Sequence, residues 1–109
     1  MTPAAAGLHK GARLIAAGEG RLRVEGVLDF DSVSGLVAES EVLFRRNARL
    51  RIDLSGVEAA NSAGLALLLE WMDLARSRRI DLRFLNLPES LVRIAAFSNL
   101  GSLLPIAQG

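Results

Sequence analysis

The side chains best suited to chemistry are an asparagine and a serine at the expected start of a helix. Asn61 and Ser62 follow the stretch Asp53-Leu54-Ser55-Gly56-Val57-Glu58-Ala59-Ala60 and precede a long apolar run. Both types are strong N-caps, because their side-chain oxygens accept hydrogen bonds from first-turn N–H groups that otherwise lack a partner. The Ser62 hydroxyl would then lie at the surface, at the positive end of a helix dipole. We expect a functional site to lie here.

Two roles are open for Ser62. It is either a helix cap and nothing more, or a phosphoacceptor, since phosphorylation would add about −1.5 to −2 charges beside the free N–H groups. No His or Lys stands next to it that could make it a hydrolytic nucleophile. The chain has no Cys, and its one His is His9. We therefore expect no catalytic residues, no bound metal and no cofactor.

Composition indicates a compact domain without a nucleic-acid partner. Of the 109 residues 50% are hydrophobic and 23% charged, with 13 basic and 12 acidic side chains and a net charge of +1. This balance argues against disorder and gives no electrostatic case for nucleic acid. No run approaches the roughly 18 apolar residues of a membrane span, and the first residues do not resemble a signal peptide. We expect a cytoplasmic protein that does not insert into a membrane.

The periodicity of the apolar residues alternates between strands and helices. We expect residues 1–11 to be a flexible lead-in and residues 12–109 to be one domain. The expected strands are 12–17 and 21–28, joined as a hairpin, then 49–54 and 82–86, with a short edge strand at 102–106; the expected helices are 32–47, 62–79 and 88–98. A turn at Ser55-Gly56 and a short loop would follow the strand 49–54. This order predicts an α/β fold, a mixed central sheet of four or five strands with about three helices packed on it.

The helix 62–79 carries two apolar stripes where a helix on a sheet needs one. The first stripe comprises Leu65, Leu68, Leu69, Met72 and Ala75, and the second comprises Ala63, Leu67, Trp71 and Leu74. Either another part of this chain covers the second stripe, or it is a partner surface with Trp71 as its anchor. The short chain offers little spare material, so we favour the partner surface. We then expect Trp71→Ala to weaken partner binding while the fold stays intact.

The same helix ends in the cluster Arg76-Ser77-Arg78-Arg79. Cations are favoured at a helix C-terminus, so the cluster has a structural explanation in that placement and in solvation. Contact with an acidic partner or with lipid head groups is the other reading.

The end of the expected strand 49–54 and the start of the expected helix 62–79 together resemble the sequence motifs of STAS domains. The family pattern is a strand ending in Asp-Leu-Ser, a short loop, and Asp-Ser-x-Gly-Leu at a helix start; here Asp53-Leu54-Ser55 and Asn61-Ser62-Ala63-Gly64-Leu65 match it. Gly26-Val27-Leu28-Asp29 lies where the family has Gly-x-Leu-Asp, and the resemblance spans roughly residues 12–107. In the anti-sigma-factor antagonists of this family, the matching serine is the phosphoacceptor. The resemblance thus implies a phospho-switch at Ser62, although Asn61 replaces the usual Asp.

The helix itself is more similar to the MlaB family, the small STAS subunits of bacterial Mla phospholipid ABC transporters. This likeness rests on the segments Gly64-Leu65-Ala66-Leu67-Leu68-Leu69, Asp73-Leu74-Ala75 and Asn99-Leu100-Gly101-Ser102-Leu103-Leu104-Pro105. It implies a non-catalytic cytoplasmic subunit at the inner-membrane face, which binds the ATPase subunit of a complex with permease and substrate-binding subunits and supports lipid asymmetry of the outer membrane. The expected contact with the ATPase subunit comprises Ser62, Ala63, Leu67, Trp71 and Leu74.

Overall fold

The computed structural model describes residues 8–9 and 11–107 as a sheet of five strands with three α-helices. The strands are β1 Leu8–His9, β2 Ala12–Ala16, β3 Arg21–Leu28, β4 Arg49–Ala60 and β5 Asp81–Leu85. The helices are α1 Val33–Arg46, α2 Ser62–Arg78 and α3 Glu89–Phe97, followed by a short 3-10 helix, η2, at Gly101–Leu103.

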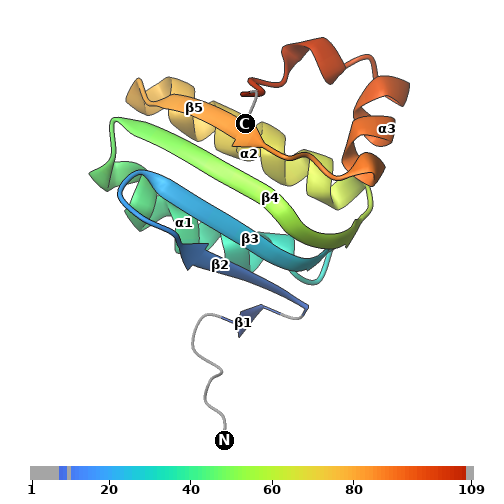
Figure 1. The fold of residues 1–109 in the computed structure, drawn as a ribbon, viewed down its shortest axis with the longest axis horizontal. Coiled ribbons are helices and arrows are strands. Elements are labelled where there is room, and N and C mark those ends of the chain that lie inside the picture. Colours follow the sequence, from blue (N-terminus) through green and yellow to red (C-terminus); the bar gives the residue numbers. More distant parts are fainter. Residues whose placement is uncertain (1–7, 10, 108–109) are drawn as a thin grey trace, which may run out of the picture.

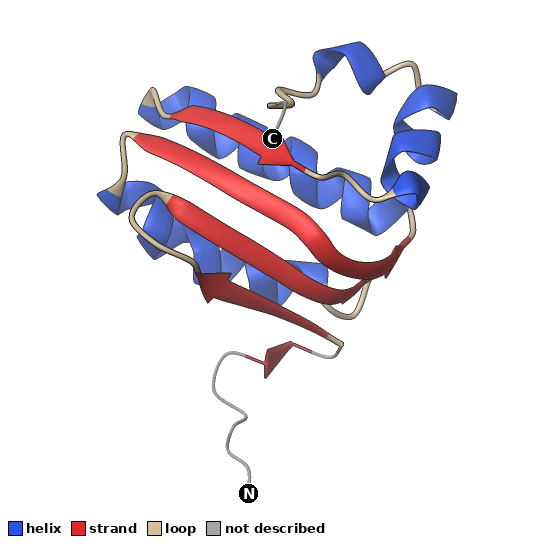
Figure 2. Cartoon of the chain, viewed as in Figure 1, coloured by secondary structure: helices blue, strands red, loops and turns tan. Residues whose placement is uncertain are grey.

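The sheet is mixed, as the element order predicts. Its strand order is β1-β2-β3-β4-β5, with antiparallel pairing from β1 to β3 and parallel pairing from β3 to β5. Helices α1 and α2 lie together behind one face, the opposite face is open, and α3 stands at the end where β4 and β5 finish (Figure 1, Figure 2). The predicted fold class is confirmed. Part of the expected lead-in, Leu8–His9, pairs with β2 as an edge strand, and residues 1–7 and 10 lie outside the described part.

The alternation of β3 and β4 separates a buried from an open face. Leu22 and Val24 on β3, and the apolar residues of β4 from Leu50 to Leu54, are buried under the helices. Between them, charged side chains point to the open face and pair across strands. Arg13 Nη2 lies 3.0 Å from Glu25 Oε1, and Arg23 Nη1 lies 3.8 Å from Asp53 Oδ2.

The turn predicted at Ser55-Gly56 is wrong, because β4 continues to Ala60. The register between β3 and β4 shifts twice along this stretch, so that β4 bulges instead of turning away. A Cβ on Gly56 would lie 2.8 Å from the Val24 carbonyl oxygen, so glycine allows the two backbones to stay together here. Ser55 and Gly56, whose composition favours a turn, therefore lie in a bulged region within a strand.

The edge strand expected at 102–106 is largely wrong as well. Residues Gly101–Leu103 form η2, and only Ile106 bridges to the sheet, opposite Phe84. The Phe84 N–H donates to the Pro105 carbonyl at 2.7 Å, and the Ala107 N–H donates to the Phe84 carbonyl at 2.9 Å. Proline has no N–H to offer a longer ladder, so this segment covers the β5 edge at one point.

Candidate functional site at the start of α2

The start of α2 is capped as the sequence predicts. Asn61 Oδ1 accepts a hydrogen bond from the Ala63 N–H at 2.8 Å, and the Asn61 N–H donates to the Leu28 carbonyl at the end of β3 at 3.1 Å. The Ser62 side chain is exposed, and its hydroxyl makes no hydrogen bond within the described residues. Asn61 therefore does the capping, and the Ser62 hydroxyl is left open to solvent or a partner.

Close packing holds this helix start against the sheet. A Cβ on Gly64 would lie 3.1 Å from the Ala60 Cβ, and 3.2 Å from side-chain carbons of Leu28 and Leu91. These neighbours come from β4, β3 and α3, so a larger residue at position 64 would push the first turn of α2 away. The glycine thus places Ser62 at a defined point, at the end of the sheet where its parallel strands finish.

The second apolar stripe of α2 is not an exposed face, and the prediction that it is one is wrong. Leu67 is 1% exposed and Trp71 is 0% exposed; Ala63 is buried and Leu74 is half-buried against the core. Helix α1 packs against this stripe at Trp71: the Trp71 and Phe44 rings are stacked with their centroids 6.5 Å apart and an interplanar angle of 25°. The structure supports the alternative in which the chain itself covers this stripe.

Ser40 is the residue that this prediction missed. Its Oγ accepts a hydrogen bond from the buried Trp71 Nε1–H at 2.8 Å and donates to the Val37 carbonyl at 2.8 Å. A buried indole N–H needs such an acceptor. The available signal was the spacing of Leu36, Ser40 and Phe44, four residues apart on one face of α1, with one small hydroxyl between apolar side chains.

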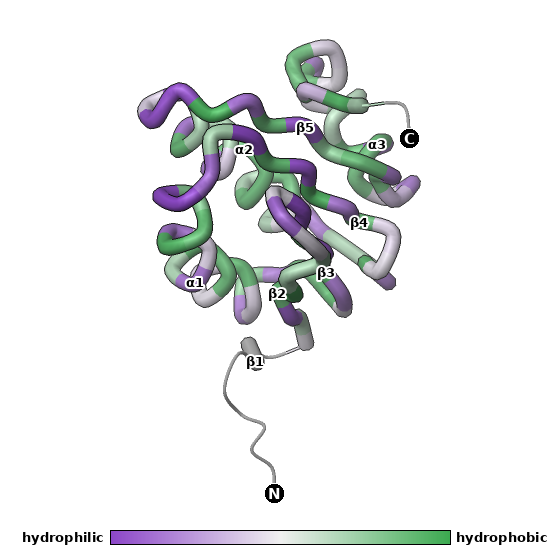
Figure 3. Tube along the Cα trace, turned by 60° about the vertical axis from the view of Figure 1, so that its left-hand side comes forward, coloured by the Kyte–Doolittle hydropathy of each residue, from purple (hydrophilic) through white to green (hydrophobic). Residues whose placement is uncertain are grey.

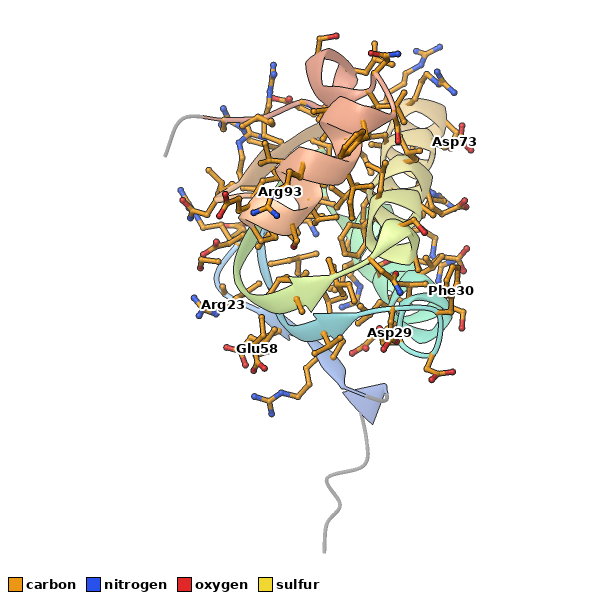
Figure 4. All side chains as sticks on the ribbon, turned by 90° about the vertical axis from the view of Figure 1, so that its right-hand side faces the viewer. Arg23, Asp29, Phe30, Glu58, Asp73 and Arg93 are labelled. Carbon is orange, nitrogen blue, oxygen red and sulfur yellow. The ribbon has the colours of Figure 1, made fainter. Side chains whose placement is uncertain are left out.

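The surface beside Ser62 is an apolar groove between α1 and α2. It has a volume of about 300 Å³, and its lining comprises Val33, Ser34, Val37, Ala66, Leu67 and Glu70. Phe30, in the loop before α1, lies at this end of the molecule beside α1 and is 73% exposed (Figure 4). Of the predicted contact residues, Ser62 lies exposed near the groove, Leu67 contributes to its floor, and Trp71 supports it from inside.

Acidic side chains lie in and near this groove: Glu70 lines it, and Asp29 and Asp31 flank Phe30 in the loop before α1. Asp29, Asp31 and Glu70 form no ion pair with any described residue. The Asp29 carboxylate instead accepts hydrogen bonds from the N–H groups of Asp31 at 3.0 Å and Ser32 at 3.2 Å, which orders the loop that carries Phe30. The groove therefore has an apolar floor with the Glu70 carboxylate at its edge, and the loop that carries Phe30 adds two acidic side chains at the same end of the molecule.

Asp53 of the strand motif has a structural role on the open face of the sheet. Partial burial works to raise the pKa of its carboxyl, but hydrogen bonds from the Asn86 side chain and from Ser55, with the nearby Arg23 charge, outweigh burial and lower that pKa. Likewise, hydrogen bonds from Arg13 and Arg23 lower the pKa of Glu25. These carboxylates bind neighbouring strands to one another and are not poised to exchange protons near neutral pH.

Comparison with known proteins identifies the family. Residues 13–105 match the family described as MlaB, STAS domain. The chain belongs to this family. Two solved structures share its fold: the anti-sigma factor antagonist SpoIIAA in its unphosphorylated form, and an anti-sigma factor antagonist from Mycobacterium paratuberculosis.

SpoIIAA is 17% identical with a TM-score of 0.69, covering 90% of this chain and 87% of its own. The mycobacterial protein is 20% identical with a TM-score of 0.70, covering 87% of this chain and 84% of its own. A search of curated proteins gives no match. At these identities the two structures support the STAS fold alone.

Two further observations concern the described part of this STAS domain. No group of three or more His, Cys, Asp or Glu side chains there has the geometry to hold a metal ion. None of its helices combines the length and the apolar character that a membrane crossing requires.

Proposed function

We propose that this STAS domain is a non-catalytic cytoplasmic subunit of a bacterial phospholipid ABC transporter, held at the inner-membrane face by binding the ATPase subunit. In that role it supports assembly and activity of a complex that also contains permease and substrate-binding subunits and maintains lipid asymmetry of the outer membrane. The match of residues 13–105 to the MlaB-type family carries this proposal.

The contact with the ATPase subunit is the groove between α1 and α2, with Ser62 at one end. Of the side chains predicted for this contact from the sequence, Ser62 touches the partner, while Ala63, Leu67, Trp71 and Leu74 hold α2 in place beneath it. Val33, Val37 and Ala66 offer the apolar surface, and the exposed Phe30 ring is the aromatic anchor. The acidic side chains in and near the groove favour a basic patch on the ATPase subunit.

The proposal is tested by titrating the cognate ATPase subunit with the full chain and two groove variants. Ala66→Arg places a bulky cation on the exposed wall of the groove and should weaken binding at least tenfold. Phe30→Ala removes an anchor that is 73% exposed, and should cost about 2 kcal/mol, or about thirtyfold in affinity.

The matched control is Ala38→Arg, which adds the same charge at an exposed position of α1 outside the groove lining. It should leave the affinity unchanged. Equal affinities for Ala66→Arg and Ala38→Arg would remove the groove from the contact, and absence of binding by the unaltered chain would refute the proposed partner.

A phospho-switch of the antagonist type is the second candidate, favoured by the exposed and unbonded Ser62 hydroxyl at the helix N-terminus. Phosphate there would accept hydrogen bonds from the first turn of α2. Incubation with the cognate anti-sigma kinase followed by intact-mass measurement tests this function. A mass increase that Ser62→Ala abolishes would support it, and an unchanged mass would contradict it.

A further inference from the structure

A second charged surface lies at the end of the molecule opposite Ser62. The parallel strands β3 and β4 begin there, and helices α1 and α2 end there (Figure 1). Figure 3 brings this end forward, and hydrophilic stretches gather at it around the ends of the two helices. We call this surface the arginine end; it comprises Arg21, Arg45, Arg46, Arg49, Arg78 and Arg79, all exposed.

The arginine end contains two adjoining clefts of about 510 Å³ each. One is lined by Arg21, Arg46, Arg49 and Arg51, and the other by Arg45, Arg46, Arg78 and Arg79. Arg46, Asn47 and Ala48 line both, so the clefts form one continuous concave surface around the turn between α1 and β4.

The positive charge there exceeds what the fold neutralises. Arg21, Arg45, Arg46, Arg78 and Arg79 form no ion pair with any described residue. Two helix C-termini supply roughly one negative charge in total, and Glu19 is the only acidic side chain among the residues lining the clefts. Arg49 shares Asp81, at 3.9 Å, with Arg51 and Arg83. Four of the six arginines lie at these helix ends, but the two dipoles offset only about one of the positive charges that lack an ion-pair partner.

The side chains that line the clefts indicate which kind of anionic partner the arginine end would bind. None of the exposed large apolar side chains, Phe30, Val42, Val92, Phe97, Leu103 or Ile106, lines either cleft. A protein interface has an apolar core, whereas the large apolar side chains that line these clefts, Phe44 and Ile80, are buried or half-buried in the domain's own core. Guanidinium groups bind phosphate oxygens in a bidentate manner, and a fluid layer of phosphate head groups can fill both clefts at once.

We propose that the arginine end binds the anionic phospholipid head groups of a membrane surface, without insertion. The positive character of this surface follows from its charges alone. The choice of a membrane over other polyanions rests on the proposed function. Because the arginine end and the Ser62 groove lie at opposite ends, the domain can contact the membrane and the ATPase subunit together.

The test is flotation of the full chain with two kinds of vesicles: phosphatidylcholine alone, and phosphatidylcholine mixed with phosphatidylglycerol. Binding is expected only to the anionic vesicles and should disappear in molar salt, where the Debye length falls to about 3 Å. Each basic residue near an anionic surface contributes about fivefold in partitioning, so Arg78→Gln/Arg79→Gln should weaken binding about 25-fold.

The matched control is Arg13→Gln/Arg83→Gln, which removes two charges from exposed positions on the open sheet face and should keep vesicle binding within a few-fold. Circular dichroism verifies the fold of both variants. Absence of binding to anionic vesicles, or equal loss in both double variants, would overturn the inference. So would tighter binding to duplex DNA than to the anionic vesicles.

These outcomes are separable from the test of the groove. Arg78→Gln/Arg79→Gln should retain full affinity for the ATPase subunit, and Ala66→Arg should retain full vesicle binding. If only vesicle binding is absent, the proposed contact with the ATPase subunit still holds. If only binding to the ATPase subunit is absent, the reason for preferring a membrane over other polyanions is lost.

Discussion

The burial of Trp71 and Ser40 leads to a quantitative prediction about stability. It distinguishes a second apolar stripe that packs against α1 from one that binds a partner. Trp71 is 0% exposed, so Trp71→Ala should cost about 3–5 kcal/mol of unfolding free energy. A domain of this size has about 5–15 kcal/mol in total. Ser40→Ala leaves a buried indole N–H without an acceptor, which costs about 1–3 kcal/mol.

Urea unfolding of Ser40→Ala, Trp71→Phe and the double variant isolates the hydrogen bond between them. The coupling energy should be about 1 kcal/mol, because the two side chains touch directly. The indole is the one tryptophan in the sequence, so its fluorescence in the unaltered chain follows unfolding directly, and circular dichroism follows the Phe variants. If Trp71→Ala left the stability unchanged but abolished binding of the ATPase subunit, the buried arrangement would be refuted. The second apolar stripe would then be an exposed partner surface.

Three further predictions concern β4 and the start of α2, and each is checked by urea unfolding. Gly56→Ala should destabilise by about 1–3 kcal/mol through its backbone clash, whereas Gly101→Ala, with nothing within 4 Å, should not. Asn61→Ala should cost about 1 kcal/mol of capping, and Ser62→Ala less than about 0.5 kcal/mol. The folded state lowers the pKa of Asp53 below its ordinary 3.8, so its stabilisation is present above that value and is lost as pH falls through the folded pKa. Asp53→Asn should flatten this acid-side loss, and an unchanged pH profile would contradict the role of its hydrogen bonds.

The order of elements follows from local patterns, and the sequence therefore predicts it well. The alternation of Leu22 and Val24 with charged neighbours, and the cap at Asn61, are properties of a few consecutive residues that the structure retains. Helix α2 begins at Ser62 as predicted, and the mixed sheet follows from a hairpin succeeded by two crossovers.

The predictions from the sequence are wrong where contact with a distant segment determines the local structure or its burial. Ser55-Gly56 has the composition of a turn, yet β3 lies alongside and pairs with it, so the chain bulges and continues as a strand. The two stripes of α2 are evident in its sequence, but helical periodicity does not show which neighbour covers a stripe. That answer depends on α1, whose Ser40 is 31 residues away from Trp71 and meets it only in the folded chain.

The burial of the second apolar stripe bears on how a partner could bind near Ser62. A stripe of exposed aromatic and aliphatic side chains would bind a partner directly, but here the same residues bind α1 to α2. The Trp71 indole is held by both a hydrogen bond and a ring contact from α1, so the two walls of the groove are fixed before any partner arrives. A preformed groove avoids the ordering cost that a flexible surface meets on binding. If the groove binds the ATPase subunit as proposed, Ser40 and Trp71 contribute to the affinity through the position of α1, without touching the partner.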